Sequence, residues 1–305
     1  MKQRKQFKWI MSLVLICFFV TTNAQDTEKK SIGEAVYSEY QKNGIDKALK
    51  MYKTAKMKNS DKYVWTEWEL NRIGYVIMNE DQDLDAAEKV FKLNMEEYPT
   101  AANPYDSYAD YLLEKGQTDE AKEYFKKSIA IAEKSDKEDE QTRIMSASKG
   151  KLAKLEKKDK QLAFLQGDWK VESTGYTDGK EAMTMKSHDK ISYNEDVNAL
   201  LIRHFNAQNE SDGIRMIAYD AMDDTFDIAY ISPDGMQGIE TSTMKMETKS
   251  PTEFTFMDKY VSRTGKDVVL KHDLQKISDN ELKWVIYEKN DAGEWQKMYA
   301  MHMTK

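Results

Sequence analysis

Histidine is the side chain in this sequence best able to bind a metal or to move a proton near neutral pH. The chain holds four histidines, His188, His204, His272 and His302. None of them stands at the short spacing by which neighbouring ligands hold a zinc ion. His302 falls in the expected last strand on the face of Met298, Ala300 and Thr304, which we expect to point inward. A hydrogen-bonded histidine in the core or at the rim is the simpler interpretation, and no metal is predicted.

Three aspartates alternate in the first half of the chain, as the first ligands of a calcium loop do. They are Asp81, Asp83 and Asp85. The sixth position of such a loop needs glycine and here holds Ala86, and the twelfth needs glutamate and holds Lys92. We therefore interpret the segment as a polar turn between two helices, in which Asp85 caps the second helix.

Two Ser-x-x-Lys motifs, at residues 146–149 and 187–190, have the residue types of an activated serine. Ser-Asp-Asn at 278–280 and Arg-Thr-Gly at 263–265 resemble the other elements of β-lactamases and penicillin-binding proteins. Their order is wrong, because the Ser-Asp-Asn element should come first, and Ser146 falls in a charged helix. We predict that the chain has no catalytic residue and that it is not an enzyme. An activity built from carboxylates and histidines of the second half is the alternative.

The first 24 residues have the pattern of a secretory signal peptide. Four basic residues precede an apolar run at 10–20, and small residues end at Ala24, so we expect cleavage before Gln25. The run has about 11 residues, whereas a helix that spans a bilayer needs roughly 20. Cys17, the only cysteine, lies in this run, so no thiol is left after cleavage. We predict a periplasmic or secreted protein with no membrane span in the mature chain.

The mature chain is expected to be acidic. Loss of the four basic residues of the signal peptide leaves 42 basic and 53 acidic residues, which is a net charge of −11. A chain with this charge repels the phosphate backbone of a nucleic acid. We therefore predict no nucleic-acid partner.

Residues 31–160 carry apolar side chains every three or four positions, which is the period of amphipathic helices. Four positions recur 34 residues later: Asp85, Ala87, Phe91 and Asn94 are followed by Asp119, Ala121, Phe125 and Ser128. A period of 34 is typical of the tetratricopeptide helical hairpin. We expect Gly74 and Ala87 to let paired helices approach closely, and Phe91 to fill the groove between them. A degenerate earlier copy runs from Ala35 to Ala55.

Residues 62–133, which include Glu69–Tyr75 and the Tyr98-Pro99 pair, resemble tetratricopeptide repeats found behind secreted bacterial serine-hydrolase domains. The resemblance covers about a quarter of the chain, and the hydrolase domain itself is not present in it. It implies contact with a protein or a peptide and says nothing about chemistry. We assign residues 25–135 to tetratricopeptide-like repeats and residues 136–160 to a capping or linking helix.

From residue 161 onward the period changes to two, which is the period of β-strands. Leu200, Ile202 and His204 share one face of an expected strand, as do Leu282, Trp284 and Ile286. Turn sequences separate the expected strands: Asp178-Gly179, Asp212-Gly213, Pro233–Gly235, Thr264-Gly265, Ser278–Asn280 and Asp291–Gly293. About eight to ten antiparallel strands fit into 161–305, enough to close a barrel. The predicted fold class is multidomain α plus β, with helical hairpins followed by an antiparallel β-barrel.

Gly167 and Trp169 form a Gly-x-Trp motif at the first expected strand. It resembles the motif of calycin barrels, the superfamily of lipocalins and fatty-acid-binding proteins. The resemblance implies that the Trp closes the base of the barrel and that a C-terminal basic residue, Lys305 or Lys297, packs over it. Most of the β region also resembles an uncharacterised bacterial lipocalin-like family. Barrels of the nitrobindin type resemble it in carrying a haem-ligating histidine near the C-terminus, which makes haem at His302 the alternative to no cofactor.

Methionine is abundant, with 18 in the chain, and its flexible side chain lines irregular apolar cavities or fills gaps in a core. We take His204, Trp284, Met298 and His302 as the candidate ligand-binding residues of the barrel. The predicted function is that of an exported, non-enzymatic binding or scaffold protein. Its repeats would contact a protein, and its barrel would hold a small apolar ligand. A purely structural interaction protein with a filled barrel is the alternative.

Overall fold

The computed structural model describes residues 29–136, 138–232, 238–262, 264–290 and 292–305. The expected signal peptide lies outside these residues. The chain divides into two compact units, one that ends at Trp65 and one that runs from Thr66 to Lys305. None of the described helices is both long enough and apolar enough to span a membrane.

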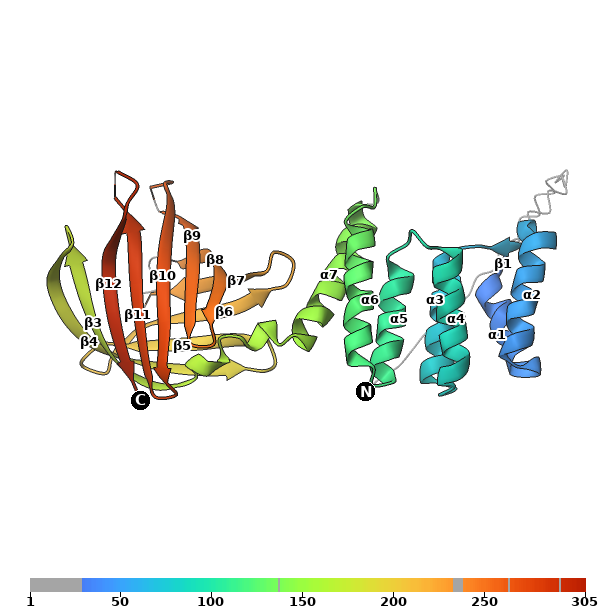
Figure 1. The fold of residues 1–305 in the computed structure, drawn as a ribbon, viewed down its shortest axis with the longest axis horizontal. Helices are drawn as coiled ribbons and strands as arrows, with labels where there is room; N and C mark the ends of the chain where they lie inside the picture. The colour runs from blue at the N-terminus through green and yellow to red at the C-terminus, as the bar shows by residue number, and fades with distance from the viewer. Residues whose placement is uncertain (1–28, 137, 233–237, 263, 291) are drawn as a thin grey trace, which may run out of the picture. The chain divides into compact units, whose positions relative to one another are not determined.

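The described part of the first unit contains one helical hairpin (Figure 1). Its elements are β1 (Lys30–Ser31), α1 (Ile32–Asn43), α2 (Ile45–Lys58), η1 (Ser60–Lys62) and β2 (Tyr63–Val64), with β1 and β2 paired in parallel. Gly44 joins the helices with a φ of +83°, which favours glycine. Ser31 caps α1 by accepting a hydrogen bond from the Glu34 amide at 3.0 Å. Ala48 and Tyr52 of the degenerate repeat copy are fully buried in this hairpin.

The helices of the second unit repeat the hairpin. They are α3 (Glu67–Asn79), α4 (Leu84–Glu97), α5 (Asn103–Glu114), α6 (Thr118–Ala132) and α7 (Glu138–Leu155). A side-chain carbon at Gly74 would lie 2.5 Å from the Phe91 ring, so glycine is needed for the close approach of α3 and α4. Phe91 on α4 and Phe125 on α6 are both fully buried. The 34-residue period therefore relates equivalent buried positions of successive hairpins.

The turn before α4 is capped by Asp83, whose carboxylate accepts a hydrogen bond from the Ala86 amide at 3.0 Å. Asp85, the expected cap, lies inside the first turn of α4, so this prediction is wrong by two residues. Gln82 turns the chain with a φ of +56°, so that the helix begins directly after Asp83. Asp85 still lies near the positive end of the helix dipole, where a carboxylate is favourable.

Polar contacts tie α7 to α5. Lys151 on α7 lies 2.8 Å from Asp106 Oδ2 and 2.7 Å from Asp110 Oδ2. The Ser148 hydroxyl donates a hydrogen bond to Asp106 Oδ1 at 2.6 Å. Because Asp106 and Ser148 are buried, these contacts satisfy groups that would otherwise destabilise the fold. Ser146 of the Ser-x-x-Lys motif is exposed on the same helix.

Two short turns, η2 (Lys158–Lys160) and η3 (Ala163–Leu165), precede a closed barrel of ten antiparallel strands (Figure 1). The strands are β3 (Gly167–Thr177), β4 (Lys180–Asn194), β5 (Ala199–Phe205), β6 (Ser211–Asp220), β7 (Thr225–Ile231), β8 (Ile239–Ser250), β9 (Glu253–Val261), β10 (Asp267–Ser278), β11 (Glu281–Lys289) and β12 (Trp295–Thr304). Each strand pairs with the next, and β12 pairs back with β3, so the closed sheet has no edge strand. The predicted fold class, helices followed by an antiparallel barrel, is confirmed.

One predicted turn is wrong. Asp212 and Gly213 lie inside β6, and the chain turns earlier, where the Asn206 amide donates a hydrogen bond to the Glu210 carbonyl at 2.9 Å. Gly213 has a φ of +128°, and a side chain there would lie 2.6 Å from the Tyr230 hydroxyl oxygen. The glycine therefore makes room for Tyr230 on the neighbouring strand β7.

The barrel is packed around Trp169 at the start of β3, and we call this region the Trp169 end. Its buried apolar side chains include Leu162, Leu165, Trp169, Val171, Leu274, Leu282 and Met303. The Trp169 indole N–H donates a hydrogen bond to the Leu165 carbonyl at 2.6 Å. Lys305 Nζ lies 4.6 Å from the centre of the Trp169 ring, whereas Lys297 stacks on a different ring. Gly167 has a φ of +142°, and a side chain there would collide with Lys305.

Candidate functional site

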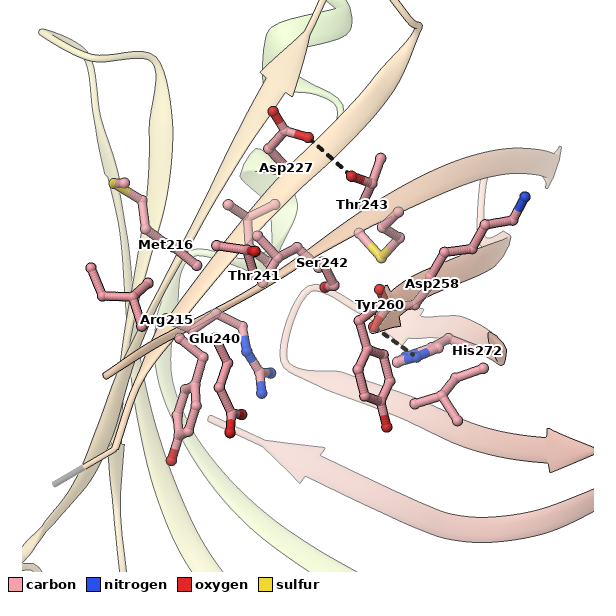
Figure 2. A pocket seen from close by; sticks show the side chains of 18 of the residues that line it. Arg215, Met216, Asp227, Glu240, Thr241, Ser242, Thr243, Asp258, Tyr260 and His272 are labelled. Carbon is pink, nitrogen blue, oxygen red and sulfur yellow. Dashed lines mark hydrogen bonds and ion pairs between the residues drawn. The ribbon is translucent and has the colours of Figure 1, made fainter. Parts of the chain in front are cut away.

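A cavity of about 1110 Å³ is lined by residues of β6 to β11, and we call this region the Arg215 end of the barrel. Its inward-facing apolar residues are Ile217, Ile228, Met244, Leu270, Trp284 and Ile286. Its inward-facing polar residues are Arg215, Tyr230, Glu240, Ser242, Asp258, Tyr260 and His272. Met216 and Asp227, which belong to the outer face of their strands, also border the space (Figure 2). The volume therefore includes space that is continuous with solvent.

Arg215 on β6 projects its guanidinium toward the space that Tyr260 and His272 also face (Figure 2). The guanidinium lies 5.4 Å from the centre of the Tyr230 ring on β7. Among the described residues, none accepts a hydrogen bond from Arg215 or forms an ion pair with it. Burial lowers the pKa of Arg215, and the charge of Asp189 acts in the opposite direction without touching it. Arg215 is thus a half-buried cation whose donors are not used by any described residue.

His272 on β10 is held as one tautomer of the neutral ring. The Trp284 indole nitrogen, which can only donate, lies 3.2 Å from His272 Nδ1. Nδ1 must therefore be the acceptor, so the proton of the neutral ring is on Nε2. Burial, and then the charge of Arg215, lower the pKa of His272 to about 4. Near neutral pH the ring is uncharged and presents an N–H at Nε2.

Asp258 on β9 faces the same space as His272. Its Oδ2 lies 3.8 Å from His272 Nε2, which is too far for a hydrogen bond (Figure 2). That Nε2 and Asp258 Oδ1 are both buried and have no hydrogen-bond partner among the described residues. Burial raises the pKa of Asp258, whereas a hydrogen bond from Ser242 and the charge of Arg215 lower it. Buried polar atoms without partners are rare in folded proteins, and they often mark functional sites.

A second histidine–aspartate pair lies on β4 and β5, where His204 and Asp189 face each other on the inward side. His204 Nδ1 is 2.8 Å from Asp189 Oδ1. His204 Nε2 is buried without a hydrogen-bond partner within the described ranges. The His204 ring lies 6.2 Å from the ring of Tyr230, centre to centre. This pair is therefore next to a residue that lines the cavity, although neither of its members lines the cavity itself.

The structure places the predicted ligand residues in different surroundings. Trp284 lines the cavity, and His204 lies behind Tyr230. Met298 is half-buried at an irregular point of β12, where the register with β11 shifts, and it does not line the cavity. Only Trp284 of the four candidates therefore contributes directly to this site.

His302 lies on the outer face of β12, and the expectation that it points inward is wrong. Its side chain is 46% exposed, and its Nε2 lies 2.9 Å from Glu281 Oε1. Met301 and Met303 occupy the inward face of this strand and pack with the core. Since neighbouring residues of a strand point to opposite sides, His302 cannot ligate a haem inside the barrel.

Sequence reasoning missed the polar residues of the cavity, although the period of two contained a signal. Asp258 shares the face of Phe256, and His272 shares the face of Leu274, both of which are buried core residues. A charged or titratable side chain in phase with a buried apolar face is an exception that marks functional sites. Arg215 gives the same signal, because it is in phase with Ile217.

The remaining histidine does not add a ligand to the site. His188 Nε2 lies 3.0 Å from Asp168 Oδ1, which is an exposed carboxylate. Within the part of the chain that the structure describes, no three side chains of His, Cys, Asp or Glu gather in a way that could hold a metal ion.

No protein-family model matches the chain, and no curated protein matches it in sequence. Its structure is similar to the crystal structure of Rv2717c from M. tuberculosis, with 12% identity and a TM-score of 0.33, over 48% of this chain and 96% of that one. It is also similar to a protein of unknown function from the DUF3598 family of Nostoc punctiforme PCC 73102. That match has 7% identity and a TM-score of 0.18, over 48% of this chain and 98% of that one. Similarities of this size assign no activity.

Proposed function

We propose that this protein is an exported, non-enzymatic binding protein whose barrel holds a small amphipathic molecule. In this proposal the barrel is lipocalin-like, and the helical hairpins are tetratricopeptide-like repeats that contact a protein. The observation that carries the barrel half is the guanidinium of Arg215, which faces the cavity without an ion-pair or hydrogen-bond partner among the described residues.

Physical chemistry favours a ligand with two kinds of surface. An unpaired polar group that is removed from water destabilises a fold, so Arg215 and Asp258 gain when a ligand supplies hydrogen bonds. Other residues of the lining, which include Met244, Trp284 and Ile286, offer apolar contact. Burial there contributes roughly 2.5 kcal/mol for each 100 Å² of apolar surface. A molecule with an apolar body and a polar head would use both parts.

The alternative of a purely structural barrel requires the interior to be filled along its whole length. The Trp169 end is filled by buried apolar side chains. The Arg215 end instead contains a cavity of about 1110 Å³, part of which is open to solvent. This volume is slightly above the range of about 300–1,000 Å³ that is typical of small-molecule sites. The geometry therefore favours binding over a purely structural role.

The repeats contain an exposed aromatic residue of the kind that anchors protein partners. Trp68 on α3 is 42% exposed, and the Arg143 guanidinium lies 5.0 Å from the centre of its ring. Tryptophan and arginine are enriched among residues that dominate binding energy at protein interfaces. We expect Trp68→Ala to weaken capture of the partner in a pull-down, with the exposed Lys126→Ala as control. Unchanged capture after deletion of residues 31–135 would argue against a role of the repeats in contact.

The barrel half is tested with Nile red, an uncharged apolar dye. We expect it to bind the intact chain with a rise in fluorescence. Ser242→Phe places a ring inside the cavity and should weaken binding about tenfold, the effect of roughly 1.4 kcal/mol. Ser192→Phe is the matched control, because Ser192 is exposed on the outer face of β4 and does not line the cavity. If the dye does not bind to the unmodified chain, the proposal that the barrel holds a ligand is wrong.

A further inference from the structure

The inward lining of the cavity carries charges of both signs. Among its described residues, Arg215 is a cation, and Asp258 is a carboxylate close enough for its charge to act on the guanidinium. Asp189 stands behind them, close enough for its charge to act on Arg215. His272 contributes no charge near neutral pH, because its ring is neutral. The inward polar residues therefore place a cation and a carboxylate near each other, and no described residue uses the donors of Arg215.

The outer-facing residues that border the cavity do not change this balance. Asp227 on β7 and Lys259 on β9 lie on the outer face and carry opposite charges. Asp227 already accepts a hydrogen bond from the Thr243 hydroxyl at 3.4 Å (Figure 2). The charge that a ligand head meets inside the barrel is therefore set by the inward residues.

Neither a carboxylate nor an ammonium head fits this wall well. A carboxylate that reaches Arg215 also approaches Asp258, whose own charge is close enough to act on that guanidinium. Like charges repel more strongly at a half-buried site than in bulk water. An ammonium head that approaches Asp258 meets the same difficulty with Arg215. Each charged head therefore gains one attraction and one repulsion.

We infer that the ligand of the barrel carries an uncharged carbonyl head, such as an amide, whose oxygen accepts hydrogen bonds from Arg215. This rests on the proposed binding function and specifies its ligand class. A carbonyl oxygen uses the guanidinium donors without adding charge beside Asp258. The amide N–H groups are donors for the carboxylate side of the wall. The apolar chain of the same molecule lies against Trp284 and Ile286.

Three probes with the same eight-carbon length and different head groups test this inference: octanamide, octanoate and octylammonium. Each is titrated near neutral pH into the intact chain loaded with Nile red, and displacement gives its affinity. We expect octanamide to bind about tenfold more tightly than the other two, the scale of one unfavourable charge contact in a partly dry site. Asp258→Asn should raise the affinity for octanoate about tenfold and leave that for octanamide nearly unchanged. Asp267→Asn, at an exposed outer-face position of β10 that does not line the cavity, should change neither affinity.

The outcomes distinguish a failure of the inference about the head group from a failure of the proposed binding function. Tighter binding of octanoate than of octanamide by the unmodified chain would overturn the inference and make Arg215 a carboxylate anchor. Equal affinity for all three probes would also overturn it, while the proposed binding function would stand. Failure of Nile red and of every probe to bind would instead overturn the proposed function. The comparison on the unmodified chain is decisive even if Asp258→Asn does not fold.

Discussion

The two ends of the barrel are built from the same sheet but differ in whether their buried polar atoms form hydrogen bonds. At the Trp169 end, the buried indole N–H donates to the Leu165 carbonyl, and apolar side chains surround it. At the Arg215 end, Arg215, His272 Nε2 and Asp258 Oδ1 have no hydrogen-bond partner among the described residues. The first end is a complete core, whereas the second has hydrogen-bonding groups that no described residue satisfies.

This difference indicates that one end of the barrel mainly stabilises the fold, whereas the other end is suited to binding a ligand. A buried polar group without a partner costs about 1–3 kcal/mol, so the Arg215 end contributes less to folding than its size implies. The apolar Trp169 end must offset that cost. Substitutions should therefore have opposite effects on stability at the two ends.

The largest expected effect is at the Trp169 end. Trp169→Ala removes the largest fully buried side chain among the described residues and leaves a cavity, and we expect a loss of about 3–5 kcal/mol in the free energy of unfolding. The measurement is urea unfolding of the barrel transition, followed by circular dichroism. A loss below about 1 kcal/mol would mean that this end is not the stabilising one.

The next effect is a pH dependence that arises at the Arg215 end. His272 has a folded pKa of about 4, below its ordinary value of 6.5. The unfolded chain therefore binds the proton first, so stability is full above about pH 6.5 and falls as the pH is lowered toward 4. The full contribution is on the order of 3 kcal/mol.

The check on this pH dependence is His272→Gln, which keeps an acceptor for Trp284 but does not titrate. Its urea midpoint should vary less between about pH 6.5 and 4 than that of the unmodified chain. His188→Gln, at a site beside an exposed carboxylate, is the matched control and should keep the dependence. Identical pH profiles for His272→Gln and the unmodified chain would contradict the role of His272.

A smaller effect of opposite sign is expected from Arg215→Leu. It replaces an unpaired, half-buried cation by an apolar side chain, so stability should be unchanged or rise by about 1–2 kcal/mol. The same variant should lose the preference for octanamide. Arg203→Leu, on the exposed face of β5, is the control and should shift the melting temperature little. Clear destabilisation by Arg215→Leu would contradict the expectation that substitutions at the two ends have opposite effects on stability.

The smallest effect concerns the tautomer of His272. Trp284→Phe removes an N–H that bonds only the unprotonated Nδ1, so the pKa of His272 should rise from about 4. A neutral hydrogen bond contributes about 1 kcal/mol, which corresponds to a rise of roughly half a unit to one unit. NMR titration of the imidazole measures it, with Trp295→Phe as control. An unchanged or lower pKa would mean that Trp284 does not hold the tautomer.

Much of the fold could be predicted because its signals are local. The helical period located the hairpins, and alternation placed Ile202 and His204 on one face of β5, which is the inward face. Alternation failed on β12, because both of its faces carry apolar residues. Met303 on one face is buried in the core, whereas His302 on the other is exposed. Alternation with a period of two shows which residues share a face of a strand, but it does not show which face points into the barrel.

By itself, the sequence determined which stretches are helices or strands and which side chains share a face, since those properties depend on neighbours a few residues apart. Only the tertiary structure decided that Arg215 of β6, Asp258 of β9 and His272 of β10 border one cavity. The physical reason is that β6 does not pair with β9 or β10. Their side chains face the same space because the sheet curves and closes, and closure is a property of all ten strands together.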